Sequence, residues 1–147
     1  MKSWLAICVV CCSSLAAACG KQEVPAPRSA LEVRSAWARA ADSGASTAIY
    51  FTLGNGGAVA DTLTAVVSAE GEETAMHVSM QHGGTMHMSP VTQLPVPAND
   101  SVSFRPLGAH VMVTGLRRGL VAGDTVMATL RFVSGATLEV RAGVRAP

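Results

Sequence analysis

The chain has 147 residues, with eleven basic and ten acidic side chains and a net charge of +1. This length is enough for one domain with its own hydrophobic core. A surface that binds nucleic acid needs clustered Lys and Arg. The charges of this chain are nearly balanced and no basic run occurs, so the sequence argues against nucleic acid as a partner.

Residues 1–19 have the pattern of an export signal. Lys2 precedes the apolar stretch "WLAICVVCCSSLAAAC", which is too short to span a membrane comfortably. The segment "LAAAC" resembles a bacterial lipobox and predicts a lipid on Cys19, although its large apolar residue lies four places before the cysteine instead of three. Cleavage near "AAA" by an ordinary signal peptidase is the alternative. Either route exports the protein, and the predicted location is the bacterial periplasm.

The rest of the chain divides into a tether and a domain. Residues 20–30, "GKQEVPAPRSA", are rich in Pro, Ala and polar residues and predict a flexible tether. Residues 31–147 are expected to form one domain. All four cysteines lie in the leader, so this exported domain must rely on a hydrophobic core or a metal and not on disulfides.

Short alternating segments separated by turn signals predict an all-β domain, an antiparallel Greek-key β-sandwich. Tyr50 and Phe51 fall on opposite faces of one predicted strand, so we expect one of them to be exposed. No segment has helical periodicity over three turns. The expected strands are 33–39, 48–54, 62–67, 74–80, 86–91, 101–105, 110–115, 125–132 and 137–141.

Methionine and histidine are concentrated in one place. Seven of the thirteen residues in "MHVSMQHGGTMHM", residues 76–88, are Met or His, although the whole chain has only seven Met and four His. Methionine can fill a core as a soft side chain. Methionine and histidine can also bind a metal.

We expect this run to form a β-hairpin that turns at the glycine pair 83–84. In that register Ser79 lies opposite Met88, and Met80 lies opposite His87. A slip of one residue would exchange the two faces of the hairpin.

The apolar residues of the hairpin indicate which face is buried. Met76, Val78 and Met80 share one face, and we expect them to face the core. His77 and Met88 then lie on the more polar face, as diagonal neighbours across the two strands.

A second segment, "HVMVTGL", alternates in the same way. Val111 and Val113 share one face and look buried, so His110 and Met112 are expected to point outward together. An exposed Met beside an exposed His is unusual as packing.

These two segments supply a candidate metal site made of His77, Met88, His110 and Met112. Thioethers select Cu(I), and the set lacks the carboxylates that Mg, Ca or Mn prefer. Zinc seldom takes Met, and a blue-copper site needs a Cys that the chain lacks after its leader. Taken singly, each Met is more often core filler and each His a surface residue, and it is the combination that predicts Cu(I) binding.

Three further residues lie outside this set. Met86 shares the predicted face of Met88 and is a candidate accessory ligand. His82 and His87, near the turn, are candidates for helping to capture copper. The alternative is that both histidines are solvent-exposed loop residues.

The sequence resembles the periplasmic PCu(A)C-type copper chaperones. The resemblance rests on the spacing His77, ten residues, Met88, twenty-one residues, His110, one residue, Met112. It is supported by "SAWARA", "AIYFTLGNGG", "ADTLTAV", "LPVPANDSVSFRPLGAHVMVTGL" and "GDTVMATLRF" and covers residues 33–141. The chain ends in "RAGVRAP" and lacks the His- and Met-rich tail that some relatives have.

The resemblance implies a cupredoxin-like β-sandwich with a surface Cu(I) site made by the four residues. It also implies delivery of copper towards the CuA centre of cytochrome c oxidase, with Sco-type copper proteins or oxidase subunit II as partners. We expect a monomeric metallochaperone and not an enzyme, attached to a membrane only through a lipid on Cys19. A periplasmic copper storage or resistance buffer using the same site is one alternative, and an envelope β-sandwich module without a metal is another.

Overall fold

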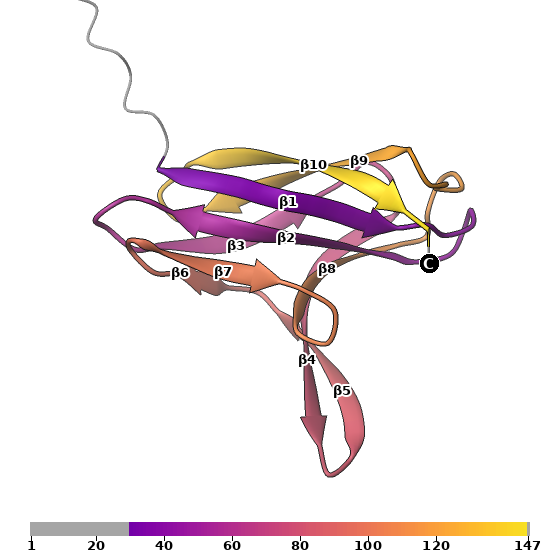
Figure 1. The fold of residues 1–147 in the computed structure, drawn as a ribbon, viewed down its shortest axis with the longest axis horizontal. Helices are drawn as coiled ribbons and strands as arrows, with labels where there is room; N and C mark the ends of the chain where they lie inside the picture. The colour runs from indigo at the N-terminus through magenta and orange to yellow at the C-terminus, as the bar shows by residue number, and fades with distance from the viewer. Residues whose placement is uncertain (1–29, 147) are drawn as a thin grey trace, which may run out of the picture.

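The computed structural model describes residues 30–146, which form ten β-strands and, within that range, no helix (Figure 1). Accordingly, the described residues contain no helix that could cross a membrane. The strands are β1 (Leu31–Arg39), β2 (Thr47–Asn55), β3 (Asp61–Val67), β4 (Glu73–His82), β5 (Thr85–Val91), β6 (Leu94–Val96), β7 (Asp100–Phe104), β8 (Ala109–Thr114), β9 (Thr125–Phe132) and β10 (Thr137–Arg145).

All nine predicted strands are present, and the sequence missed only β6. This strand has three residues with Pro95 in the middle, and it pairs with β3 at the end of the strand order. A proline inside a short segment usually indicates a turn, so the sequence did not predict this strand. Proline is tolerated in an edge strand because its missing N–H is not needed for pairing there. The export signal, Cys19 and residues 20–29 of the predicted tether lie outside the described residues.

The strands form one continuous sheet in the order β5-β4-β8-β7-β2-β1-β10-β9-β3-β6. Most neighbours are antiparallel, but β1 pairs in parallel with β10, and β7 with β8 through a single residue pair. Buried residues from strands far apart in this order, such as Leu63 of β3 and Val111 of β8, belong to one hydrophobic cluster. The sheet therefore folds over its own core, and the predicted all-β sandwich is confirmed, with these two parallel pairings added.

Strand β2 lies in the middle of the sheet and is covered on both sides. Phe51 packs in the core, stacked on Phe104 with a centroid distance of 4.2 Å. Tyr50, on the opposite face, is also buried. The expectation that one of these two rings is exposed is therefore wrong. A central strand of a folded sheet can have both faces covered, which alternation alone does not reveal.

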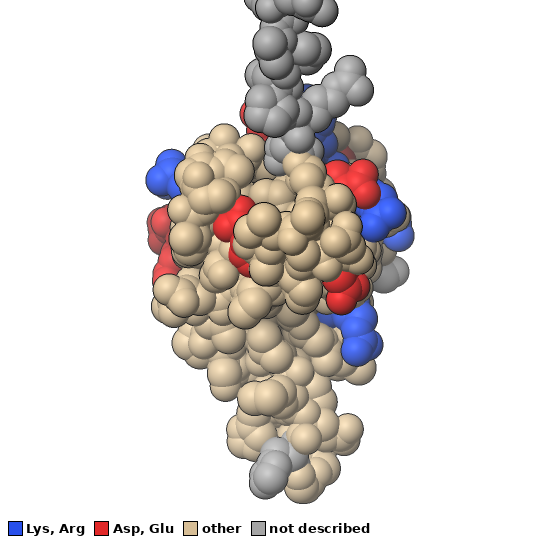
Figure 2. Space-filling model, turned by 90° about the vertical axis from the view of Figure 1, so that its left-hand side faces the viewer, with Lys and Arg blue, Asp and Glu red and all other residues tan. Residues whose placement is uncertain are grey.

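Strands β4 and β5 form a hairpin that projects from the sandwich (Figure 1). Ser79 pairs with Met88 and Met80 with His87, which is the predicted register. The glycines at 83–84 have φ angles of 58° and 83°, and this left-handed conformation at both turn positions favours glycine. No charged residue occurs between Glu73 and Asp100, and Figure 2 shows the projecting end free of Lys, Arg, Asp and Glu on the face in view.

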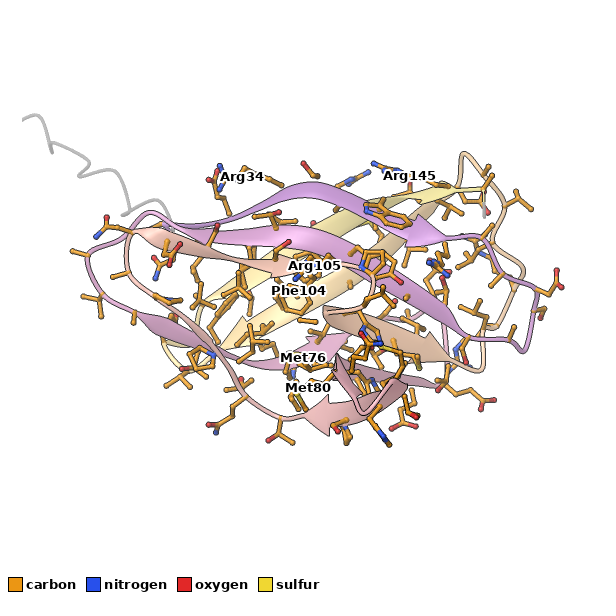
Figure 3. All side chains as sticks on the ribbon, turned by 60° about the horizontal axis from the view of Figure 1, so that its bottom comes forward. Arg34, Met76, Met80, Phe104, Arg105 and Arg145 are labelled. Atoms are coloured by element: carbon orange, nitrogen blue, oxygen red, sulfur yellow. The ribbon has the colours of Figure 1, made fainter. Side chains whose placement is uncertain are left out.

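The projection of the hairpin changes the environment of its methionines, which Figure 3 labels along β4. Met76 lies at the base and is buried in the core, as expected. Met80 lies nearer the turn and is 57% exposed, so its assignment to the core is wrong. Both residues share a face of the strand, but the sandwich beneath that face ends before Met80.

These two positions predict different effects on stability. Met76→Ala should lower the free energy of unfolding by about 2–5 kcal/mol, because it leaves a cavity in the core. Met80→Ala should change it by less than about 0.5 kcal/mol, because an exposed side chain loses little packing. Urea unfolding of the two variants measures both values, and equal effects would contradict the placement of these side chains.

Candidate metal centre

Two histidines from separate strands lie directly opposite each other. The antiparallel pairing of β4 with β8 places His77 next to His110. Their rings stack with a centroid distance of 5.8 Å and an angle of 20° between their planes. Residues 78–109 separate them in the chain, so only strand pairing brings the two imidazoles together.

Two methionines lie at opposite diagonals of this histidine pair. Met88 lies opposite Ser79 on one side of β4, and Met112 lies opposite Ala75 on the other side. Because alternate residues of a strand share a face, both methionines lie on the face of His77. Met88 is 51% exposed and Met112 is half-buried. The four residues that the sequence singled out thus share one face, and their metal binding stays a prediction.

His110 differs from its expected position at the surface. It is only 4% exposed, so the expectation that it points outward into solvent is wrong. It lies between the His77 ring and the buried Tyr50 ring, whose centroid is 6.4 Å away. The inward-facing valines 111 and 113 are fully buried as expected. The face of His110 is covered by neighbouring strands, and this follows from the fold and not from the alternation of β8.

The His110 ring is held by its own loop. Its Nδ1 lies 3.0 Å from the Gly108 carbonyl oxygen. A carbonyl only accepts hydrogen bonds, so Nδ1 carries the proton and the lone pair is left on Nε2. Such a contact fixes the orientation and tautomer of a ligating histidine. His110 is therefore oriented to offer Nε2 to an electrophile.

His77 has a buried nitrogen without a partner. Its Nδ1 is enclosed and has no hydrogen-bond partner within the described residues. Burying such an atom unpaired costs about 1–3 kcal/mol, and buried polar atoms are rarely left this way. A metal ion bound at this nitrogen would satisfy it, so the donor set and the orphaned atom fit a metal.

The choice of metal depends on the thioethers. Within residues 30–146, no three His, Cys, Asp or Glu side chains lie close enough together to hold a metal ion. The two imidazoles are therefore the only described nitrogen ligands on this face, and Met88 and Met112 are the soft donors beside them. Thioether sulfur is a soft ligand that selects Cu(I) over Zn, Mg or Ca.

The hairpin separates the three accessory candidates. Met86 lies opposite Gln81, shares the face of Met88 and is 45% exposed. His87 lies opposite Met80 and therefore on the other face. His82 pairs through its backbone with Thr85, and its side chain is outside the description. Of the two described candidates, only Met86 is on the side of the four-residue set.

A hollow of about 460 Å³ opens beside the site. Three of the four predicted residues line it, together with side chains that sequence reasoning did not assign to the site, above all Tyr50 and Arg39. Tyr50 comes from β2, which pairs with β8, and this pairing puts its ring next to His110. Arg39 lies in the "SAWARA" segment. Nothing in its distance along the chain from the Met/His run indicates that the two belong to one site.

The fold and this face define a class of protein, a β-sandwich domain that presents two imidazoles and two thioethers together. The chain belongs to the family described as "Putative lipoprotein LpqE-like", which matches residues 31–144. "Putative lipoprotein Lxx21020" from Leifsonia xyli subsp. xyli (strain CTCB07) is 29% identical over 116 residues, covering 78% of this chain and 69% of that protein.

Solved structures with the same fold are copper proteins by name. The solution structure of CuI-DR1885 from Deinococcus radiodurans is 31% identical, with a TM-score of 0.60, over 80% of this chain and 81% of that one. The copper-bound PCuAC domain from PmoF2 has a TM-score of 0.66 at 22% identity, over 80% of this chain and 94% of that domain. The expected cupredoxin-like fold is confirmed.

The tautomer of His110 can be tested in the metal-free protein. Long-range ¹H–¹⁵N correlation spectra should show His110 protonated at Nδ1, because the Gly108 carbonyl accepts that proton. On addition of Cu(I), the Nε2 resonance of His110 should shift most. Finding the proton on Nε2 would contradict the proposed orientation of this ring.

Proposed function

We propose that this protein is an exported copper chaperone that binds Cu(I) through His77, Met88, His110 and Met112. One observation carries the proposal: two imidazoles face each other across β4 and β8, with a thioether at each diagonal. The likeness to CuI-DR1885 and to PCuAC domains supports the same metal. Copper is the cargo of this protein, and we assign no catalytic residue.

The ligands suit a monovalent ion that must be released again. All four are neutral when they bind, and no charged residue occurs from 74 to 99. A neutral soft set stabilises Cu(I) and lacks the thiolate that a blue-copper electron-transfer centre needs. In an oxidising compartment a Cys ligand can be lost to disulfide formation, whereas Met cannot form a disulfide. The Met sulfur remains open to sulfoxide formation.

Burial differs among the ligands and suggests how copper leaves. His110 is buried and tied to Gly108, whereas Met88 is half-exposed on a hairpin that projects into solvent. An incoming ligand can approach from the side of Met88 while His110 still holds the metal. Transfer would then proceed through intermediates that share ligands between donor and acceptor.

The proposed destination is the CuA centre of cytochrome c oxidase, with Sco-type copper proteins or oxidase subunit II as direct partners. The proposed location is the periplasm, with a lipid on Cys19 as the anchor and the segment 20–30 as a tether. The lipoprotein family and the Leifsonia relative described as a putative lipoprotein support the anchor. We propose that the protein acts as a monomer.

Loss of the thioethers should weaken Cu(I) binding. Met88→Ala and Met112→Ala should each lower the affinity by about tenfold or more, which corresponds to about 1.4 kcal/mol. Competition with bathocuproine disulfonate measures the affinity. Met80→Ala is the matched control, because it removes an equally exposed Met from the other face of the same hairpin.

Binding that survives the double variant Met88→Ala/Met112→Ala would refute the site. A protein that does not compete for Cu(I) at all would instead support an envelope module without a metal.

The alternative function, a copper storage or resistance buffer, uses the same site. A strain that lacks this gene should lose cytochrome c oxidase activity and recover it when copper is added, if the protein delivers copper. Copper sensitivity with normal oxidase activity would instead indicate buffering. Complementation with the Met88→Ala/Met112→Ala variant is the control that links either phenotype to the site.

A further inference from the structure

The hollow beside the metal site contains one charged side chain. Arg39 lines it together with Met88, His110 and Met112, and no other Lys, Arg, Asp or Glu does so. The Arg39 guanidinium lies 6.0 Å from the centroid of the Tyr50 ring, and that centroid is 6.4 Å from the His110 ring. The cation and the buried ligand therefore lie against the same aromatic ring.

Two contacts hold the backbone of Arg39 in place. Thr47 Oγ1 donates a hydrogen bond of 2.7 Å to the Arg39 carbonyl, and Thr47 is buried. Arg39 also ends β1, where it pairs with Arg145 of β10. The side chain is exposed, so a hydrogen-bonded backbone presents a solvent-accessible cation to the hollow.

Arg39 has no carboxylate partner among the described residues. The ion pairs found there are made by Arg34 with Glu32 and by Arg118 with Glu70 and Asp124. A neutral Cu(I) site gains nothing from a nearby cation. An unpaired guanidinium in this place instead suits an anion that enters the hollow, because Arg is a strong and permanently charged donor.

The hollow is also lined by apolar side chains, one of which is highly exposed. Leu107 is 74% exposed and has a φ of 62°, a left-handed conformation that is unfavourable for a side chain of this type. Pro106 and Met88 lie beside it along the hollow. Residues held in such conformations cluster at binding sites, and here the strain keeps an apolar side chain in solvent next to the metal ligands.

We propose that this hollow receives a cysteine thiolate from the polypeptide of a copper acceptor. Arg39 attracts the negative sulfur, and Leu107 packs against the apolar part of the incoming segment. The inference rests on the proposed function, and it adds the place where the acceptor docks and the roles of Arg39 and Leu107 in receiving it.

The exchange is balanced without oxidation or reduction. The thiol proton goes to solvent, the thiolate forms a bond to Cu(I), and the thioether of Met88 leaves as a neutral group. A thiolate is softer than the thioether and charged, so transfer runs towards the acceptor. A free Cys has a reference pKa of about 8.5, and a neighbouring Arg favours its ionised form, so Arg39 raises the fraction of acceptor that can attack.

The first test removes the charge and keeps the metal site. Arg39→Gln should leave the equilibrium Cu(I) affinity unchanged and slow transfer to an otherwise uncharged dithiol peptide by about tenfold, within the range of electrostatic effects on association. Transfer to neocuproine, a neutral nitrogen chelator, should not change. Stopped-flow mixing with the Cu(I)-loaded protein measures both rates.

Two variants control for the loss of side-chain volume and of overall charge. Arg39→Lys should keep most of the transfer rate, because it keeps the cation. Arg145→Gln removes an arginine at the end of β10 (Figure 3) and should have no effect. The Arg145 guanidinium lies 5.0 Å from the centroid of the Trp37 ring, and Arg145 does not line the hollow. Equal rates for Arg39→Gln and the unaltered protein, at unchanged affinity, would overturn this proposal and leave the proposed function standing.

The second test separates a polypeptide from a small thiol. Leu107→Asn keeps a residue that tolerates the left-handed conformation and removes the apolar contact. It should slow transfer to the dithiol peptide but not to dithiothreitol. If Leu107→Asn affects neither reagent while Arg39→Gln slows both, the hollow serves a small thiol and the polypeptide partner is overturned. If the unaltered protein does not load with Cu(I), both this proposal and the proposed function fail.

Discussion

The antiparallel pairing of β4 with β8 is the constraint on which the rest of the site depends. It sets His77 against His110 and, by the same register, places Met112 at one diagonal. The hairpin pairing of β4 with β5 then places Met88 at the other diagonal. A shift of one residue in either ladder would send part of the set to the opposite face. The glycine turn and the buried valines of β8 make such a shift costly, because they fix the hairpin length and the inward face.

The sandwich supports the proposed ligands to different degrees. His110 sits where β2, β4 and the loop at Gly108 meet, so its ring is oriented before any metal arrives. Met88 is carried by an edge strand on a projecting hairpin, and the core does not reach it. A buried imidazole and a half-exposed thioether on one face would allow the proposed site to retain an ion and still admit a partner. This gradient of burial, together with the lack of charge on the hairpin, distinguishes the site from a closed structural metal site.

Alternation along single strands accounts for the successes and for the errors of sequence reasoning. The glycine turn correctly paired Ser79 with Met88, and alternation correctly put Met76 in the core. Alternation failed for Met80, because the strand continues past the end of the core, and for Tyr50, because both faces of β2 are covered. Alternation reports which residues share a face, whereas burial depends on what another part of the chain lays over that face.

The sequence by itself determined the strand pattern, the hairpin turn and the two Met/His pairs, because these follow from local periodicity, from the demand for glycine at the turn and from residue chemistry. The tertiary structure alone decided that His77 and His110 stack, that Gly108 orients the second ring, and that Arg39 and Tyr50 border the same hollow. These contacts join strands that are distant in the chain. Their register is set by how the whole sheet closes over its core, and no local pattern in one strand carries that information.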